Sequence, residues 1–341
     1  MIPYETFNTL VLAIILLVGL VMLCVGGDWL AKGAASFALI LKINPVVVGL
    51  TIVSISTSMP EMITAFIAAA GGNSGLAVGN IVGSNLGNAG LILGVAALIY
   101  PITIQNRLVK QEVPLLLIVT VMFTLMSMGG FLAAGEIGRL EGILLLAGAA
   151  GYLFFMVMQA KRSGPEETTE IGEELADELK DPIDSMGKCL LFIIVGSVFL
   201  AIGAEMLVGS SVQIATRLGV SEVLIGLTLV ALGTSLPELA ASAAAALRKQ
   251  SDIIAGNIVG SNIFNMLLIG GSVSTFFPLQ VERRLFVIEF PSMVLLTLLL
   301  WFAFYTERKV TRLEGGFLVT LYFVIIGLSS LSQMGKILPG I

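Results

Sequence analysis

The sequence consists of apolar runs of about twenty residues, separated by short stretches of polar residues, glycine or proline. A helix of this length crosses the roughly 30 Å hydrocarbon core of a bilayer. Only 12% of the 341 residues are charged, about half the ~25% usual for soluble domains. These features predict an all-α membrane protein with ten transmembrane helices. The runs lie near residues 8–27, 45–70, 76–100, 113–131, 140–160, 189–208, 223–247, 253–277, 285–305 and 315–331.

The residues before the first run carry no basic cluster and no small-residue cleavage site. We therefore expect the first run to be a retained span and not a signal peptide. The chain has no histidine, which excludes imidazole metal sites and histidine-based catalysis. Cys24 and Cys189 lie in different apolar runs and form no C-x-x-C motif. We expect no resident cofactor, no enzymatic activity and no nucleic-acid partner. The bilayer is the expected surrounding, and no obligate protein partner is evident.

One long polar segment divides the chain. It is rich in glutamate and aspartate and predicts three parts: a first five-helix unit at 1–162, an acidic linker at 163–187 and a second five-helix unit at 188–341. We interpret the segment as a solvated linker, with a regulatory calcium site as the alternative. If the N-terminus is outside, 13 of the 18 lysines and arginines face inward. The positive-inside rule then predicts a multi-pass protein of the cell membrane with both termini outside and the linker in the cytoplasm.

The two halves are internally repeated at an offset of 177 residues. The segment Gly49–Glu61, with sequence GLTIVSISTSMPE, matches Gly226–Glu238, with sequence GLTLVALGTSLPE. The heptapeptide GNIVGSN occurs at residues 79–85 and again at 256–262. Because each half holds five spans, an odd number, the second copy enters the membrane from the opposite side. Inverted repeats of this kind are the architecture of secondary transporters that expose one central site alternately to each side.

Each repeat places a carboxylate after a proline inside an apolar span, as Pro60-Glu61 and Pro237-Glu238. An acid at this depth costs several kcal/mol, about 2.5–3.5 on insertion scales, and therefore suggests a functional site. Proline removes a helical hydrogen bond, so each helix should break there and leave the glutamate near the N-terminus of the resumed half. The hydroxyls in the same turns add oxygen donors, namely Thr57, Ser58, Thr234 and Ser235.

The following span of each half carries polar residues at i, i+4 and i+8, which lie on one face of a helix. These residues are Asn80, Ser84 and Asn88 in the first half, and Asn257, Ser261 and Asn265 in the second. Simple interhelical hydrogen bonding is the alternative interpretation. Together the two spans offer oxygen ligands without nitrogen or sulfur, a set that suits Ca²⁺ or Na⁺ better than a transition metal. One Ca²⁺ or two monovalent ions neutralise two glutamates, so competition for one site can drive exchange.

The paired T-S-[LM]-P-E segments, each followed by G-N-I-V-G-S-N, resemble the α-repeats of the calcium/cation antiporter superfamily, specifically the prokaryotic Na⁺/Ca²⁺ exchangers. The resemblance spans both halves. It implies a fold of five plus five helices, four central ion subsites, and sliding of the first and sixth helices. It also implies the ligands Glu61, Glu238, Thr57, Ser58, Thr234, Ser235, Ser84, Asn88, Ser261 and Asn265, with backbone carbonyls at Ser54 and Ala231. Asn265 stands where some of these exchangers carry an aspartate, which bears on the number of Na⁺ ions bound.

The sequence therefore predicts an antiporter that exchanges Ca²⁺ for Na⁺ by alternating access, with inorganic cations as its partners. The nearest alternative is the same fold coupled to H⁺, or moving another cation. An ion channel and an intramembrane hydrolase are more distant alternatives. Nothing in the sequence positions a scissile bond, and an inverted repeat within one chain favours a carrier over a pore.

Overall fold

The computed structural model describes residues 3–129, 135–162, 182–218, 233–306 and 308–333. The first half contains η1 (Tyr4–Thr6), α1 (Thr9–Leu41), α2 (Pro45–Val48), η2 (Gly49–Val53), α3 (Ser54–Thr57), α4 (Met59–Ala70), α5 (Ser74–Leu86), η3 (Gly87–Ile92), α6 (Leu93–Ile99), β1 (Ile102–Thr103), η4 (Leu108–Glu112), α7 (Val113–Ser127), β2 (Glu136–Ile137) and α8 (Arg139–Arg162). The second half contains α10 (Met186–Arg217), α13 (Leu236–Leu247), α14 (Ser251–Phe264), η6 (Asn265–Gly270), α15 (Gly271–Phe276), β3 (Leu279–Gln280), η7 (Arg283–Phe286), α16 (Glu289–Thr306), β4 (Lys309–Val310) and α17 (Arg312–Gln333).

The prediction of an all-helical multi-pass protein is confirmed. In the described part of the chain, eight helices are long and apolar enough to cross a membrane, and a ninth span consists of Pro45–Thr57 and Met59–Ala70, bent by 43°. The shorter apolar helix α13 is the repeat counterpart of α4. It forms the second part of the predicted span at 223–247, whose residues 223–232 lie outside the described residues.

Two very short strand pairs join the repeats at separate places. Ile102 of β1 pairs with Val310 of β4, and Ile137 of β2 pairs with Leu279 of β3, both antiparallel. β1 and β3 occupy equivalent positions in the two repeats, 177 residues apart. Each pair therefore links one repeat to the other.

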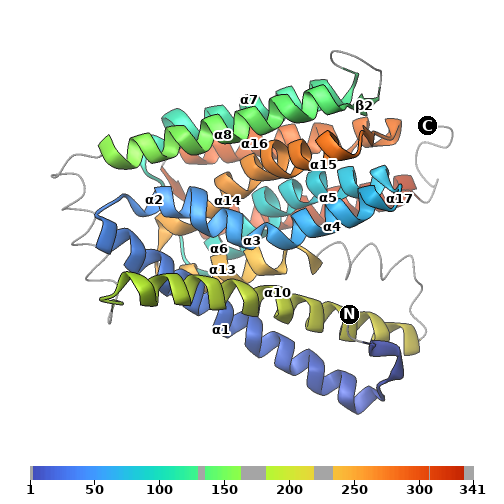
Figure 1. Ribbon diagram of the computed structural model, residues 1–341, viewed down its shortest axis with the longest axis horizontal. Helices are drawn as coiled ribbons and strands as arrows, with labels where there is room; N and C mark the ends of the chain where they lie inside the picture. The colour runs from blue at the N-terminus through green and yellow to red at the C-terminus, as the bar shows by residue number, and fades with distance from the viewer. Residues whose placement is uncertain (1–2, 130–134, 163–181, 219–232, 307, 334–341) are drawn as a thin grey trace.

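Helices α1 and α10 form an antiparallel pair along one side of the molecule, while the remaining helices build a bundle beside them (Figure 1). Glycines allow the two backbones to touch. A Cβ on Gly19 would lie 2.8 Å from the carbonyl oxygen of Gly203, and one on Gly26 would lie 2.8 Å from that of Gly196. These four glycines are related by the repeat, so the pair packs around its own local two-fold axis, as small-residue interfaces in membranes allow.

Both helices are longer than the sequence predicts. α1 continues to Leu41, beyond the predicted end of the first run at residue 27, and α10 continues to Arg217. The prediction was wrong at these ends because polar or small residues interrupt the apolar run without ending the helix. These residues are Asp28 and Lys32 in α1 and Gly209, Ser210 and Ser211 in α10. A helix of 33 residues is about 50 Å long, more than the hydrocarbon thickness.

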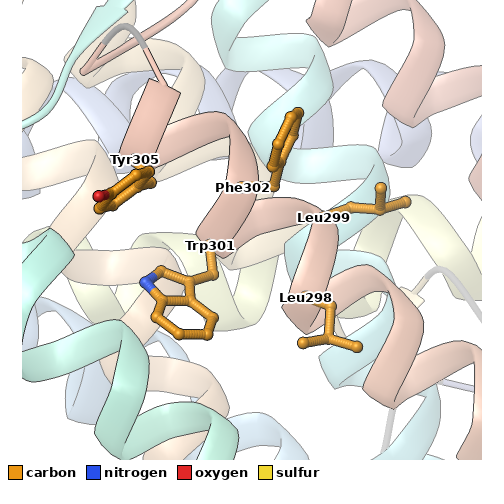
Figure 2. Close-up of a pocket in the computed structure, with 5 residues that line it drawn as sticks. All are labelled: Leu298, Leu299, Trp301, Phe302 and Tyr305. Atoms are coloured by element: carbon orange, nitrogen blue, oxygen red, sulfur yellow. The ribbon is translucent and has the colours of Figure 1, made fainter.

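The outer surface carries many exposed apolar side chains, including Ile14, Phe154, Ile194 and Phe323, as expected for contact with lipid. On α16 such side chains line an apolar groove of about 610 Å³, shown in Figure 2. The groove is lined by Leu298, Leu299, Trp301, Phe302 and Tyr305. It offers no carboxylate or amide oxygen and therefore does not suit a cation.

The predicted acidic linker follows α8, which ends at Arg162, and α10 begins at Met186. Residues 163–181 lie outside the described residues, and both the solvated linker and the calcium site there remain predictions. The backbone N–H of Ile183 donates to Ser36 Oγ at 3.0 Å, which holds the approach to α10 against α1.

Candidate functional site

The two glutamates occupy equivalent positions at helix breaks. Glu61 lies in the first turn of α4 and Glu238 in the first turn of α13, each with a proline at the start of the helix. The preceding residues, Ser58 and Ser235, have nearly identical non-helical angles, φ −83° and ψ 4° against φ −89° and ψ 4°. The break predicted from the prolines is confirmed. Each carboxylate therefore faces the positive end of a helix dipole, which stabilises negative charge.

The two repeats bring these glutamates together. Both residues are 1% exposed. Ser58 Oγ of the first repeat donates to Glu238 Oε1 of the second at 3.1 Å. Ser235, the counterpart of Ser58, has its Oγ 3.5 Å from that of Ser84. The site therefore lies between the repeats and draws on both.

Each threonine beside a break forms a hydrogen bond with an asparagine of the other repeat. Thr57 Oγ1 donates to Asn257 Oδ1 and Thr234 Oγ1 donates to Asn80 Oδ1, both at 3.3 Å. Asn80 also donates from Nδ2 to the backbone carbonyl of Glu61 at 3.1 Å. Asn80 and Asn257 thus fix the broken helices through hydrogen bonds across the site.

The remaining predicted ligands lie in the same region, with one exception. Ser261 Oγ lies 3.4 Å from Asn257 Oδ1, and Ser54 Oγ donates to the backbone oxygens of Gly49 and Asn257 at 2.7 and 3.0 Å. The Ser54 carbonyl accepts from the backbone N–H of Ser58 at 3.0 Å. Ala231, the predicted counterpart of Ser54, lies outside the described residues.

Four buried asparagines face one another at the centre of the bundle. Asn88 Nδ2 donates to Asn262 Oδ1 and Asn265 Nδ2 donates to Asn85 Oδ1, both at 3.0 Å. Sequence reasoning named Asn88 and Asn265 but missed Asn85 and Asn262. The repeated G-S-N motif was a signal for them, but their partners depend on how the repeats pack.

The polar atoms left without partners at this site are all oxygens. They are Glu61 Oε1, Glu61 Oε2, Glu238 Oε2, Asn88 Oδ1 and Asn265 Oδ1. A buried acceptor without a donor costs about 1–3 kcal/mol, and more when it is charged. A cation satisfies such a set, because it binds oxygen acceptors and neutralises the carboxylates. The residues present therefore fit a hard cation bound by oxygen.

The backbone near the site is unusual as well. η2, η3 and η6 are π-helical segments, and the last two directly follow α5 and α14. Such wide turns are rare and occur frequently at functional sites, because the extra residue redirects the side chains that follow. The sequence pattern did not predict them.

Comparison with known proteins identifies the chain. The family described as sodium/calcium exchanger protein matches residues 11–158 and 188–331, which together cover most of both halves. The chain belongs to the sodium/calcium exchanger family. It is therefore a cation antiporter of a transporter family and not an enzyme.

Individual relatives match nearly the whole chain. The inner membrane protein YrbG of Escherichia coli is 33% identical over 90% of this chain and 94% of its own length. The sodium/calcium exchanger MaX1 of Methanosarcina acetivorans is 31% identical over 92% of this chain and 97% of its own length. A solved structure of the sodium-calcium exchanger NCX_Mj superposes with a TM-score of 0.78 at 30% identity, covering 94% of this chain and 99% of that one.

Proposed function

We propose that this exchanger-family antiporter moves Ca²⁺ in exchange for Na⁺, by competition of the two ions for the site between Glu61 and Glu238. The set of five unpartnered buried oxygens carries the proposal. Ca²⁺ accepts six to eight oxygens at about 2.3–2.6 Å in flexible geometry, whereas Mg²⁺ demands a compact octahedron and retains water. Carboxylates, amides and hydroxyls from two repeats supply the looser arrangement.

Charge balance supports exchange at a single site. Two ionised glutamates carry a charge of −2, which one Ca²⁺ or two Na⁺ neutralise. A site emptied of cations would leave two buried negative charges side by side, which is strongly unfavourable. Movement between the two access states therefore favours the loaded site, which couples the two ion fluxes.

The proposed ligands are Glu61, Glu238, Thr57, Ser58, Thr234, Ser235, Ser84, Asn88, Ser261 and Asn265, with the backbone carbonyls of Ser54 and Ala231. The proposed domains are the five-helix units 1–162 and 188–341 joined by the acidic linker 163–187. We place both termini outside and the linker in the cytoplasm. In the proposed mechanism, α1 and α10 slide as one unit past the bundle.

The direct test is ⁴⁵Ca²⁺ uptake into proteoliposomes loaded with Na⁺, compared with vesicles that carry only a pH gradient. Uptake driven by the Na⁺ gradient and abolished when the gradient is collapsed supports the proposal. Uptake driven only by the pH gradient would replace Na⁺ with H⁺ as the coupling ion. Absence of Ca²⁺ uptake under both gradients would refute Ca²⁺ as the transported ion.

Glu61→Gln and Glu238→Gln test the site itself. Each leaves a divalent cation with one uncompensated buried charge, and breaking a buried pair costs about 3–5 kcal/mol. We expect each variant to lose Ca²⁺ uptake while keeping its elution profile in detergent. Glu282→Gln is the matched control, because Glu282 pairs with Arg284 away from the site. Uptake retained in either glutamine variant at the wild-type level would refute the assignment.

A further inference from the structure

The four central asparagines are arranged as two crossed pairs. Each repeat contributes two of them three residues apart, Asn85 with Asn88 and Asn262 with Asn265. The later residue of each repeat donates to the earlier residue of the other, and the two bonds have the same length of 3.0 Å. All four residues are buried, with at most 2% exposed. The same arrangement thus occurs twice, related by the repeat.

A side-chain amide has a donor end and an acceptor end of nearly the same size. In Asn88 and Asn265 the nitrogen is bound to the neighbouring asparagine, which leaves the oxygen as the free end. These two oxygens are among the unpartnered acceptors of the site. A reversed amide would present its NH₂ group to the cation and would oppose two oxygens at the neighbouring asparagine.

We propose that Asn85 and Asn262 are positioning residues for the cation site. Asn85 fixes the amide of Asn265 and Asn262 fixes the amide of Asn88, each with its oxygen toward the ion. The inference rests on the proposed function, since it assigns a role relative to the same cation. It adds two residues that do not contact the ion and that act across the boundary between the repeats.

The other bonds of the positioning residues are weak, which favours this role. Asn85 Nδ2 reaches only the sulfur of Met293 at 3.7 Å, and Asn262 Nδ2 reaches the backbone oxygen of Asn85 at 3.5 Å. Their side-chain oxygens make the shorter bonds. Groups that orient a metal ligand typically change metal affinity by about 10–100-fold when mutated.

Double-mutant cycles on Ca²⁺ affinity separate positioning from a general structural role. Asn85→Leu removes the acceptor at similar size, and we expect it to weaken Ca²⁺ binding by about tenfold. The same substitution should have little further effect in an Asn265→Ala background, where its target is gone, but its full effect in Asn88→Ala. Asn262→Leu should show the reverse pattern, coupling to Asn88 and not to Asn265.

Two further variants protect the test against unfolding. Asn85→Asp keeps an acceptor oxygen at the same place, and its Ca²⁺ affinity should not fall below that of the wild type. If Asn85→Leu is not recovered folded, Asn85→Ser shortens the side chain and should give the same coupling pattern. Additive effects in all pairs, equal coupling to both asparagines, or unchanged affinity in the Leu or Ser variant would overturn the inference.

The two levels of failure are distinguishable. If the wild type shows no Na⁺-driven ⁴⁵Ca²⁺ uptake, the proposed function fails. If the wild type exchanges the ions and the crossed coupling is missing, only the positioning role fails.

Discussion

An ion pair ties α1 to the bundle near Asp28, and it predicts a bias between the two access states. Arg248, directly after α13, donates from Nε to Asp28 Oδ1 at 2.8 Å, and its Nη2 contacts the same oxygen. Beside it, a Cβ on Gly27 would lie 2.7 Å from the carbonyl oxygen of Ala240, so the helices also touch there. The repeat counterparts of Asp28 and Arg248 are Glu205 and Gly71, which cannot form the same pair. The described residues of α10 and α4 also make no contact comparable to that of α1 with α13.

The exposure of the pair sets the size of the effect. The Arg248 and Asp28 side chains are 28% and 49% exposed, so solvent screens much of their attraction. Exposed ion pairs contribute about 0.2–1 kcal/mol. With 1.4 kcal/mol equal to a factor of ten, values of about 0.4–1 kcal/mol within that range correspond to roughly a two- to fivefold change in an equilibrium. We therefore expect Asp28→Asn to shift the population of the two access states by about that factor, away from the state described here.

The measurement is the apparent Ca²⁺ affinity at each membrane face, obtained in right-side-out and everted vesicles. Apparent affinity scales with the fraction of molecules open to that face. Asp28→Asn should change the ratio of the two affinities about two- to fivefold in favour of the face at which Asp28 and Arg248 meet, which we place in the cytoplasm. The swapped variant Asp28→Arg/Arg248→Asp should restore the ratio. An equal change in Glu205→Gln, or no restoration in the swapped variant, would refute the reasoning.

Three further predictions concern other parts of the molecule. Gly203→Leu should abolish exchange, because even a Cβ at this position would lie 2.8 Å from the Gly19 carbonyl oxygen. A Cβ on Gly151 of α8 would have no neighbouring atom within 4 Å, so the control Gly151→Ala should retain wild-type ⁴⁵Ca²⁺ uptake. Tyr152→Phe removes the 3.1 Å hydrogen bond to the buried Glu112 carboxyl group. It should lower the free energy of unfolding by about 1.5–3 kcal/mol and lower the melting temperature in detergent. Tyr305→Phe is the exposed control. Glu173→Gln/Glu174→Gln in the linker should leave turnover unchanged, and a strong loss of uptake would instead favour a regulatory calcium site there.

The spans were predictable because the bilayer imposes a length on every apolar run. The ends of α1 and α10 were not, because charged, polar or small residues end an apolar run without ending a helix. Asp28 lies inside α1 and pairs with Arg248, a partner 220 residues away. Hydropathy along the chain contains no information about such a partner.

The site was predictable to the extent that it depends on local chemistry. Proline breaks the helix wherever it stands, so the positions of Glu61 and Glu238 followed from the sequence. The roles of Asn85 and Asn262 did not, because they lie off the i, i+4, i+8 face on which their neighbours were found. Their partners belong to the other repeat, and only the packing of α5 and η3 against α14 and η6 brings them together.

The repeat symmetry is kept in the hydrogen bonds of the threonines and of the central asparagines, and it is lost in the contacts of α1 with the bundle. The threonine bonds to Asn257 and Asn80 have the same length, and so do the crossed asparagine bonds. A site that must accept the same ions from either side gains from this equivalence, because each repeat then offers the same ligands to its own face. Among the described residues, the contacts of α1 with α13 are not repeated between α10 and α4. A transporter that closed both ends equally would expose its site to neither side. We therefore expect a site that draws equivalent ligands from both repeats to need unequal contacts at its two ends, and the ion pair of Asp28 with Arg248 is such a contact.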